Sequence, residues 1–164
     1  MSDLKQFLEL FNPYPGNSFL EVNVGISDTT IALQELLQKV DGNLDLVIYN
    51  DEESDLKKEF PNSKIQQISD LSKPFRAMPR SADIVIFKDI FHLHTNQDMI
   101  IKTAYTALAN TADIIIMQKK GTMNIEATYD MLERLEFRAA NYIDVLPEYD
   151  LVMAKKMHMW GNGL

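Results

Sequence analysis

The sequence contains no cysteine among its 164 residues, and it has only 6 glycines and 6 prolines. The lack of cysteine excludes disulfides, a thiolate nucleophile and a zinc site built from cysteine ligands. No apolar run approaches about 18 residues, so the sequence predicts no membrane-spanning helix. The opening residues, MSDLKQFLELF, are amphipathic and lack the basic and then apolar pattern of a signal peptide. We therefore expect a cytoplasmic protein.

Positive charge is also scarce, because 16 lysines and arginines stand against 24 aspartates and glutamates, a formal net charge of −8. A surface of this sign repels phosphate backbones and anionic lipid, so neither nucleic acid nor a membrane is an expected partner. Apolar residues (46%) and charged residues (24%) occur in the proportions of a globular protein. At this length we expect a single domain over residues 1–164, with an N-terminal helix and connecting loop in residues 1–17.

Three segments are apolar almost throughout: LDLVIY at 44–49, ADIVIF at 82–87 and ADIIIM at 112–117. Strands of this kind suit a parallel sheet that helices cover on both faces. The alternation of strand and helix patterns along the chain favours the same arrangement. The sequence therefore predicts an α/β fold with a doubly wound, mostly parallel seven-strand sheet in a three-layer α/β/α sandwich.

The remaining elements follow from periodicity, caps and breakers. Shorter strands are expected at 18–24 and 64–68, and helices at 2–11, 52–60, 95–109 and 125–135, with one more helix that Asp28 caps. The last two strands, 139–145 and 149–157, surround the turn Leu146-Pro147-Glu148 and are typical of an antiparallel β-hairpin.

Polar side chains gather where the expected strands end. Glu21, in the first strand, is followed at alternate positions by Asn23, Gly25 and Ser27. Further polar residues follow the second, third and fourth strands: Asp51, Asp70, Lys88, Asp89 and His92. Because open α/β sheets bind ligands at the carboxyl ends of their strands, these residues form the candidate site.

Five strand–helix units followed by a terminal hairpin resemble the class I S-adenosylmethionine (SAM)-dependent methyltransferases, and the resemblance covers residues 18–156. In that Rossmann-like family an acid is followed by alternating glycines, D/E-x-G-x-G-x-G. Here Glu21 supplies the acid and Gly25 the middle glycine, whereas Asn23 and Ser27 replace the first and third. Asparagine and serine are the mildest replacements, because asparagine tolerates positive φ and serine is small. The Asn23 side chain is nevertheless expected to point toward the methionine part of SAM.

The resemblance implies roles for the residues at the strand ends. Asp51, or Glu52 after it, would accept hydrogen bonds from the ribose hydroxyls, and Asp70 would meet the adenine amino group. The implied cofactor-binding residues are Glu21, Asn23, Gly25, Ser27, Asp51, Asp70 and Lys88, and the catalytic candidates are Asp89 and His92.

Each of these residues also has a purely structural interpretation. Gly25 suits any tight turn after a strand, Asp51 a helix start, and Asp70 an ordinary turn. His92 and His94, with Asp89, raise the question of a metal site. Their segment falls in a strand-to-helix turn and not clearly on a strand, so no metal is expected.

Two functions remain open at this point. The first is transfer of a methyl group from SAM, with S-adenosylhomocysteine (SAH) as product, to a small-molecule or protein acceptor. The second is a catalytically inactive, methyltransferase-like binding or scaffold module, because two motif glycines and a substrate cap are missing. A nicotinamide dehydrogenase is disfavoured, since G-x-G-x-x-G is absent. Met153, Met157, Met159 and Trp160 are expected as core or dimer contacts, which makes a homodimer a candidate assembly.

Overall fold

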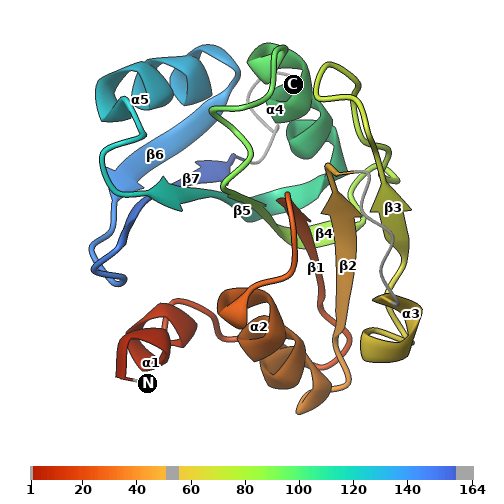
Figure 1. Ribbon diagram of the computed structural model, residues 1–164. Helices are drawn as coiled ribbons and strands as arrows, with labels where there is room; N and C mark the ends of the chain where they lie inside the picture. The colour runs from red at the N-terminus through yellow and green to blue at the C-terminus, as the bar shows by residue number, and fades with distance from the viewer. Residues whose placement is uncertain (1, 51–55, 158–164) are drawn as a thin grey trace.

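The computed structural model describes residues 2–50 and 56–157, which form one seven-stranded sheet flanked by helices (Figure 1). The strands are β1 (Ser18–Asn23), β2 (Asn43–Ile48), β3 (Ile65–Gln67), β4 (Ala82–Lys88), β5 (Leu108–Lys119), β6 (Phe137–Tyr142) and β7 (Tyr149–Lys156). Their order is β3-β2-β1-β4-β5-β7-β6. Strands β1 to β5 pair in parallel, and β7 lies antiparallel to both β5 and β6. The predicted sheet and its terminal hairpin are thus confirmed.

The described helices form two layers. They are α1 (Ser2–Leu8), α2 (Asp28–Gln38), α3 (Leu56–Glu59), α4 (Gln97–Ala107) and α5 (Ile125–Arg134). Figure 1 shows α1, α2 and α3 below the sheet and α4 and α5 above it, which makes the predicted α/β/α sandwich. Within the described ranges, no helix combines the length and apolar character that a membrane crossing requires.

Two apolar clusters, one on each face of the sheet, hold the layers together. Successive side chains of a strand point to opposite faces, so Leu20 and Val22 pack under α4 while Phe19 packs against α1 and α2. Glu21 therefore lies on the α2 face, between the buried apolar residues Leu46 of β2 and Ile86 of β4. Fully burying each large apolar side chain contributes about 1.5–3 kcal/mol, so these clusters supply the main driving force for folding.

Several predicted boundaries are wrong in instructive ways. The N-cap of α2 is Ser27, and Asp28 is the first helical residue, where its negative charge favours the helix dipole. The helix expected at 95–109 stops at Ala107, because the chain enters β5 at Leu108, four residues before the expected strand start. The first helix ends at Leu8 and not at residue 11. Of the helix expected at 52–60, residues 52–55 lie outside the described ranges.

Candidate active site

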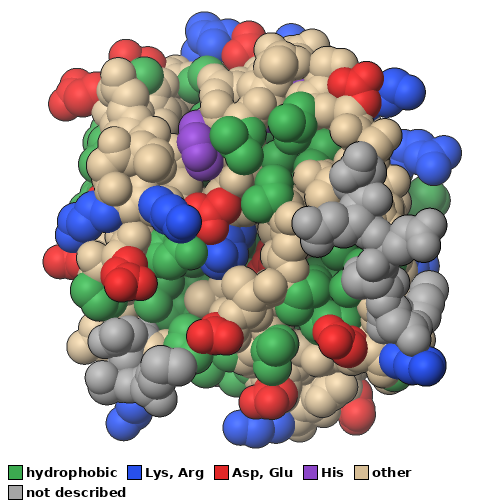
Figure 2. Space-filling model, in the orientation of Figure 1, with side chains coloured by type: hydrophobic (Ala, Val, Ile, Leu, Met, Phe, Trp, Pro, Cys, Tyr) green, Lys and Arg blue, Asp and Glu red, His purple; other side chains and the backbone are tan. Residues whose placement is uncertain are grey.

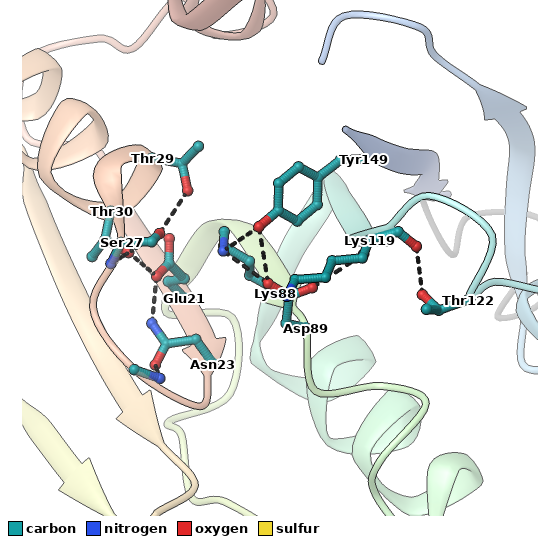
Figure 3. A network of polar contacts seen from close by, with 11 residues as sticks. Glu21, Asn23, Ser27, Thr29, Thr30, Lys88, Asp89, Lys119, Thr122 and Tyr149 are labelled. Atoms are coloured by element: carbon teal, nitrogen blue, oxygen red, sulfur yellow. Dashed lines mark hydrogen bonds and ion pairs between the residues drawn. The ribbon is translucent and has the colours of Figure 1, made fainter. Parts of the chain in front are cut away.

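The strand order reverses between β1 and β4, because the chain adds β2 and β3 on one side of β1 and then returns to add β4 on its other side. Most of the candidate residues lie at the carboxyl ends of these two strands. In the parallel pairing, Asn23 at the end of β1 stands opposite Lys88 at the end of β4. Residues paired in this way share a face, so Glu21, Asn23 and Lys88 all lie on the α2 side of the sheet. Figure 3 shows the polar network that these residues form with α2 and with the start of β7. An open α/β sheet binds ligands at this kind of switch point.

Glu21 is fully buried at the centre of the first half of the network. Its Oε2 accepts hydrogen bonds from the Asn23 amide nitrogen and from Thr30 Oγ1, the latter at 2.5 Å. Its Oε1 is buried and has no hydrogen-bond partner in the part of the chain that the structure describes. Burial raises the pKa of the Glu21 carboxyl, although both hydrogen bonds and the charge of Lys88 act in the opposite direction. The carboxyl group therefore keeps one acceptor atom unsatisfied, which costs free energy unless a further donor reaches it.

The two residues that replace motif glycines, Asn23 and Ser27, hold the loop between β1 and α2. Asn23 Oδ1 accepts a hydrogen bond from the backbone N–H of Gly25 at 3.1 Å, so its side chain turns to Glu21 and to its own loop. The Ser27 backbone N–H donates to Thr30 Oγ1 at 3.2 Å and starts α2. The Ser27 hydroxyl also bonds with Thr29 Oγ1 at 3.0 Å. Both replacements thus make side-chain bonds that glycine cannot make.

Gly25 itself is not required by backbone conformation, contrary to the tight-turn interpretation, because its φ lies outside the left-handed region. Among residues 2–50 and 56–157, apart from Gly25 and its two chain neighbours, no residue has an atom within 4 Å of where a Cβ atom at Gly25 would stand. The space beside this glycine is therefore open, which suits close approach of a ligand to the backbone.

Lys88, Asp89 and Tyr149 form the second half of the network. Lys88 Nζ donates to Asp89 Oδ2 at 2.9 Å and to the Tyr149 hydroxyl at 3.1 Å, and the Tyr149 hydroxyl donates to the same Asp89 oxygen at 3.2 Å. Asp89 Oδ1 accepts from the backbone N–H of Lys119 at 3.1 Å. Asp89 has a φ of 56°, a conformation that costs energy for a residue with a side chain. These bonds fix that conformation and join the ends of β4, β5 and β7.

The charge of Lys88 survives its burial because of these partners. Burial alone acts to lower the pKa of the amine, but the hydrogen bonds and charges of Asp89 and Tyr149 outweigh it. The pKa of Lys88 therefore lies above its ordinary value, and the side chain is a permanent cation at the floor of the site.

A pocket of about 220 Å³ opens beside the network. Its walls come from the start of α2, from Lys88, from α1 and from the turn before β7, with the lining residues Leu4, Ser27, Asp28, Thr29, Lys88, Leu146, Pro147, Glu148 and Tyr149. Figure 2 shows this face of the molecule, where basic and acidic side chains lie together in a hollow near the middle. The pocket brings a buried cation, hydroxyl groups and the free N–H groups of a helix start to one place.

The other predicted site residues lie apart from this network or outside the described ranges. Asp51 falls among residues 51–55, so its ribose-binding role stays a prediction. Asp70 is exposed in the loop after β3, and the backbone N–H and hydroxyl of Ser72 donate to it. His92 is exposed in the turn after β4. The roles of Asp70 at adenine and of His92 in catalysis also stay predictions.

The metal question centres on His94, which is buried and fully engaged. Its Nδ1 accepts from the Asn96 backbone N–H at 2.9 Å, so Nε2 carries the proton and donates to the Lys73 carbonyl at 3.0 Å. Neither ring nitrogen is left for a metal ion. Over residues 2–50 and 56–157, no group of three or more histidine, aspartate or glutamate side chains could hold one.

Two residues of the network were missed by sequence reasoning. Thr30 lies three residues after Ser27, and this spacing of hydroxyl residues at a helix start is the signal that could have indicated its role. Tyr149 lies 60 residues from Asp89 in the sequence, and only the antiparallel pairing of β7 with the end of β5 brings it to the site. No local pattern indicates that contact.

Comparison with known proteins gives structural neighbours only. No family model and no curated protein matches the sequence. A SAM-dependent methyltransferase from Aquifex aeolicus superposes with a TM-score of 0.76 at 14% identity, covering 94% of this chain and 90% of that one. Phosphoethanolamine N-methyltransferase 2 from Haemonchus contortus, solved with SAM, gives 0.74 at 13% identity over 95% of this chain, which spans 52% of that protein.

A TehB-like SAM-dependent methyltransferase from Corynebacterium glutamicum gives a TM-score of 0.69 at 13% identity, covering 94% of this chain and 87% of that one. The likeness extends over nearly the whole chain and includes the antiparallel last strand, which distinguishes this sheet from other Rossmann-like sheets. The protein therefore has the fold of the class I SAM-dependent methyltransferases.

Proposed function

We propose that the protein binds SAM at the carboxyl ends of β1 and β4 and transfers its methyl group to a small-molecule or protein acceptor. The observation that carries the proposal is the polar network across the switch point, with open space beside Gly25 and a pocket over Lys88. The general tendency of open α/β sheets to bind ligands at the carboxyl ends of their strands supports this location.

The residues present fit a cofactor that carries a positive charge and hydrogen-bond donors. Glu21 offers an unsatisfied buried oxygen, and the loop backbone at Gly25 can be approached closely. The start of α2 adds N–H groups that favour a negatively charged group such as a carboxylate. SAM, when bound, supplies a methyl group on a sulfonium that an in-line nucleophile can accept.

The chain itself supplies mainly position and exclusion of water. Lys88 and Tyr149 face the pocket and are held rigidly by Asp89, so a polar acceptor group placed there would be oriented without side-chain rearrangement. Asp89 uses both carboxylate oxygens in these bonds, and we therefore assign it a positioning role. Alignment of the acceptor with the methyl group is the largest contribution that this site can make.

A specific observation also supports the second candidate, a binding or scaffold module without catalysis. The Gly25 N–H is already taken by Asn23, and both Asp89 oxygens have partners, so the site is satisfied in several places where a ligand would compete. A module of this kind would bind SAM or SAH without turnover, or bind neither. The two candidates are therefore separated by binding and turnover measured on the same protein.

The first experiment is calorimetric titration of the protein with SAM and with SAH, followed by assay of SAH release with candidate acceptors. Micromolar binding of both with SAH release supports the enzyme. Binding without release for any acceptor favours a module that binds SAM. Absence of heat at millimolar ligand contradicts SAM binding and leaves only the module that binds neither ligand.

A Gly25→Ala variant makes the titration specific to the site. The added methyl group meets no protein atom, so stability stays equal or rises slightly, whereas SAM affinity falls about tenfold if the loop lies against the ligand. Gly42→Ala is the matched control, because its Cβ would lie 2.8 Å from Leu37 Cδ2 and 2.9 Å from the Asn17 carbonyl oxygen. That variant should lose stability, while its folded fraction keeps full affinity. Equal SAM affinity for Gly25→Ala and wild type would contradict the proposed binding mode.

Location and assembly remain part of the proposal. The lack of cysteine and the acidic composition support a cytoplasmic protein. Met153 is half-buried against the α2-side cluster, whereas Met157 is exposed, and Met159 and Trp160 lie outside the described ranges. The homodimer thus stays a prediction, which sedimentation equilibrium would test.

A further inference from the structure

A second hollow lies at the edge of the sheet opposite the candidate active site. This amino-end pocket, of about 420 Å³, is lined by the beginnings of β1, β2 and β4, by β3 and by residues 76–78 and 81. Residues 68–81, which join β3 to β4, contain no helix, so a loop covers this part of the sheet face. A loop fills the space over a sheet less completely than a helix does, which accounts for the hollow. Its volume lies within the range of roughly 300–1,000 Å³ of small-molecule sites.

The amino-end pocket carries two cations that have no partner. Lys64 and Arg76 line it, and over residues 2–50 and 56–157 both make hydrogen bonds through their backbone atoms only. Asp45 also lines the pocket, but its Oδ1 already accepts from the Asn43 side chain at 2.6 Å and the Lys64 backbone N–H at 3.0 Å. The pocket lining thus carries two positive side chains and one negative side chain, which gives a local excess of positive charge. That excess is unusual in a chain of net charge −8.

Arg76 is held at the mouth of the pocket by a side-chain clamp. Gln66 Oε1 accepts from the Arg76 backbone N–H at 2.9 Å, and the Gln66 side-chain amide donates to the Arg76 carbonyl oxygen. This reciprocal pair ties the loop to β3 in the manner of a strand pairing. The backbone of Arg76 is thus fixed at the mouth of the pocket, whereas its exposed side chain is left to reach a ligand there.

The rest of the amino-end pocket is apolar. Leu20, Ala77 and Ala82 contribute side chains that belong to the cluster under α4, and Met78 lies at the rim with 69% of its surface exposed. A methionine beside a cation is suited to a ligand with an apolar body, because the flexible methionine side chain adapts to irregular shapes.

We propose that the amino-end pocket binds a small organic acid, with its carboxylate on Arg76 and Lys64 and its apolar body against Leu20, Ala77 and Met78. The planar guanidinium fits a carboxylate through two parallel N–H bonds, and Lys64 adds a second charge. This site is independent of the proposed methyl transfer, because it shares no lining residue with the pocket at Lys88. Occupancy of one site need not exclude the other.

The test is a titration of the full chain in which NMR of the backbone amides detects binding. The three probes are sodium hexanoate, sodium acetate and hexanol. Hexanoate carries both the charge and the apolar body, acetate carries the charge alone, and hexanol carries the body alone. Hexanoate should shift amides at residues 64–66, 76–78 and 81 and bind at least about tenfold more tightly than either fragment probe. Equal binding of hexanol, or shifts spread over the surface without the pocket amides, would overturn the proposal.

Two variants link the titration to the cations. Arg76→Gln and Lys64→Gln each remove a charge without breaking a side-chain bond, so both should fold and each should weaken hexanoate binding about tenfold. Lys73→Gln is the control, because Lys73 lies on the same loop but does not line the pocket. If Lys73→Gln weakens binding as much as Arg76→Gln does, the effect is general charge attraction and the proposed site is wrong. If inorganic phosphate binds as tightly as hexanoate, the proposal is also wrong, because the apolar wall of the pocket then contributes nothing to affinity.

Discussion

Lys88 and Lys156 are two buried lysines whose surroundings look alike at first. They are 6% and 5% exposed, and the amine of each lies over a tyrosine ring, at 4.8 Å from the centroid of Tyr149 and 4.5 Å from that of Tyr105. They differ in what receives their hydrogen bonds. Lys88 has a carboxylate partner in Asp89, whereas within residues 2–50 and 56–157 Lys156 donates to the backbone carbonyl oxygens of Tyr105 and Leu108.

The pKa values of the two amines consequently move in opposite directions. Burial lowers the pKa of Lys156, and the positive charge of Arg80 lowers it further. For Lys88 the acid and the tyrosine outweigh burial. Lys156 donates hydrogen bonds to the carbonyl oxygens of Tyr105 and Leu108 at the end of α4, and it therefore acts as a C-terminal helix cap. Burial of a charged group therefore does not by itself indicate a functional site; its partners and an adjacent pocket do.

The largest expected effect comes from Lys88→Met. The variant leaves the Asp89 carboxylate without its cation at the end of β4, and removal of one partner from such a pair costs about 3 kcal/mol of unfolding free energy. Urea denaturation measures this cost. Lys88→Met combined with Asp89→Asn should recover a large part of it, because the unpaired charge is gone. If the double variant is no more stable than the single one, the pair is not what holds the strand ends together.

Lys156→Met should cost less, about 2 kcal/mol by the same measurement. The carbonyl oxygens of Tyr105 and Leu108 lose their donor, but release of an unpaired buried charge offsets part of that loss. Since no acid is paired with Lys156, no second substitution should rescue the variant. Lys156→Gln retains a donor and should lie between methionine and wild type; a glutamine variant as unstable as the methionine one would argue against the cap.

Glu21→Gln should stabilise the protein by about 1 kcal/mol at neutral pH. The glutamine oxygen can accept the bonds from Asn23 and Thr30, and the charge that burial disfavours is removed. The raised pKa means that the folded state keeps a proton that the unfolded chain has lost above the ordinary value of 4.5. Stability of the wild type therefore falls as pH rises through that window, whereas the variant lacks this fall.

The same substitution connects stability to the proposed site. If Glu21 serves SAM through its unsatisfied oxygen, Glu21→Gln should weaken SAM binding while it raises the unfolding midpoint. Thr30→Val is the matched control, since it removes a donor to Glu21 and leaves the charge in place. A Glu21→Gln variant that is more stable and binds SAM as tightly as wild type would show that this carboxylate is structural.

Most of the fold could be predicted because it depends on local patterns. Apolar strands such as 82–87 and the breakers between elements indicate where strands and helices alternate along the chain. The start of β5 at Leu108 could not be found this way, since Ala107 and Leu108 suit a buried helix and a buried strand equally.

The site was predicted less completely, because only part of it depends on local sequence patterns. The positions of Glu21, Lys88 and Asp89 follow from where strands end. The bonds that Asn23 and Tyr149 make depend on distances between elements, and these appear only when the sheet is assembled. The side chain of Asn23 was expected to point toward SAM, yet it is bonded to Glu21 and Gly25.

The smallest expected effect is a difference in alkaline pH dependence between the two lysines, whose ordinary pKa is 10.5. The lowered pKa of Lys156 means that, just below that value, the unfolded chain binds more protons than the folded one. Its contribution to stability therefore rises with pH in this window. The raised pKa of Lys88 makes its contribution to stability change with pH in the opposite direction. Its contribution is constant below the ordinary value and is lost only as pH rises through the folded pKa above it.

Subtracting the stability of each methionine variant from that of wild type isolates these contributions. Urea denaturation from about pH 8 to about pH 11 should give a difference that grows for Lys156→Met. For Lys88→Met the difference should stay level and then decline at the upper end of the range. Two difference curves of the same slope would mean that Asp89 does not set the charge of Lys88, and the distinction between a paired lysine at a pocket and an unpaired lysine at a helix end would then have no energetic basis.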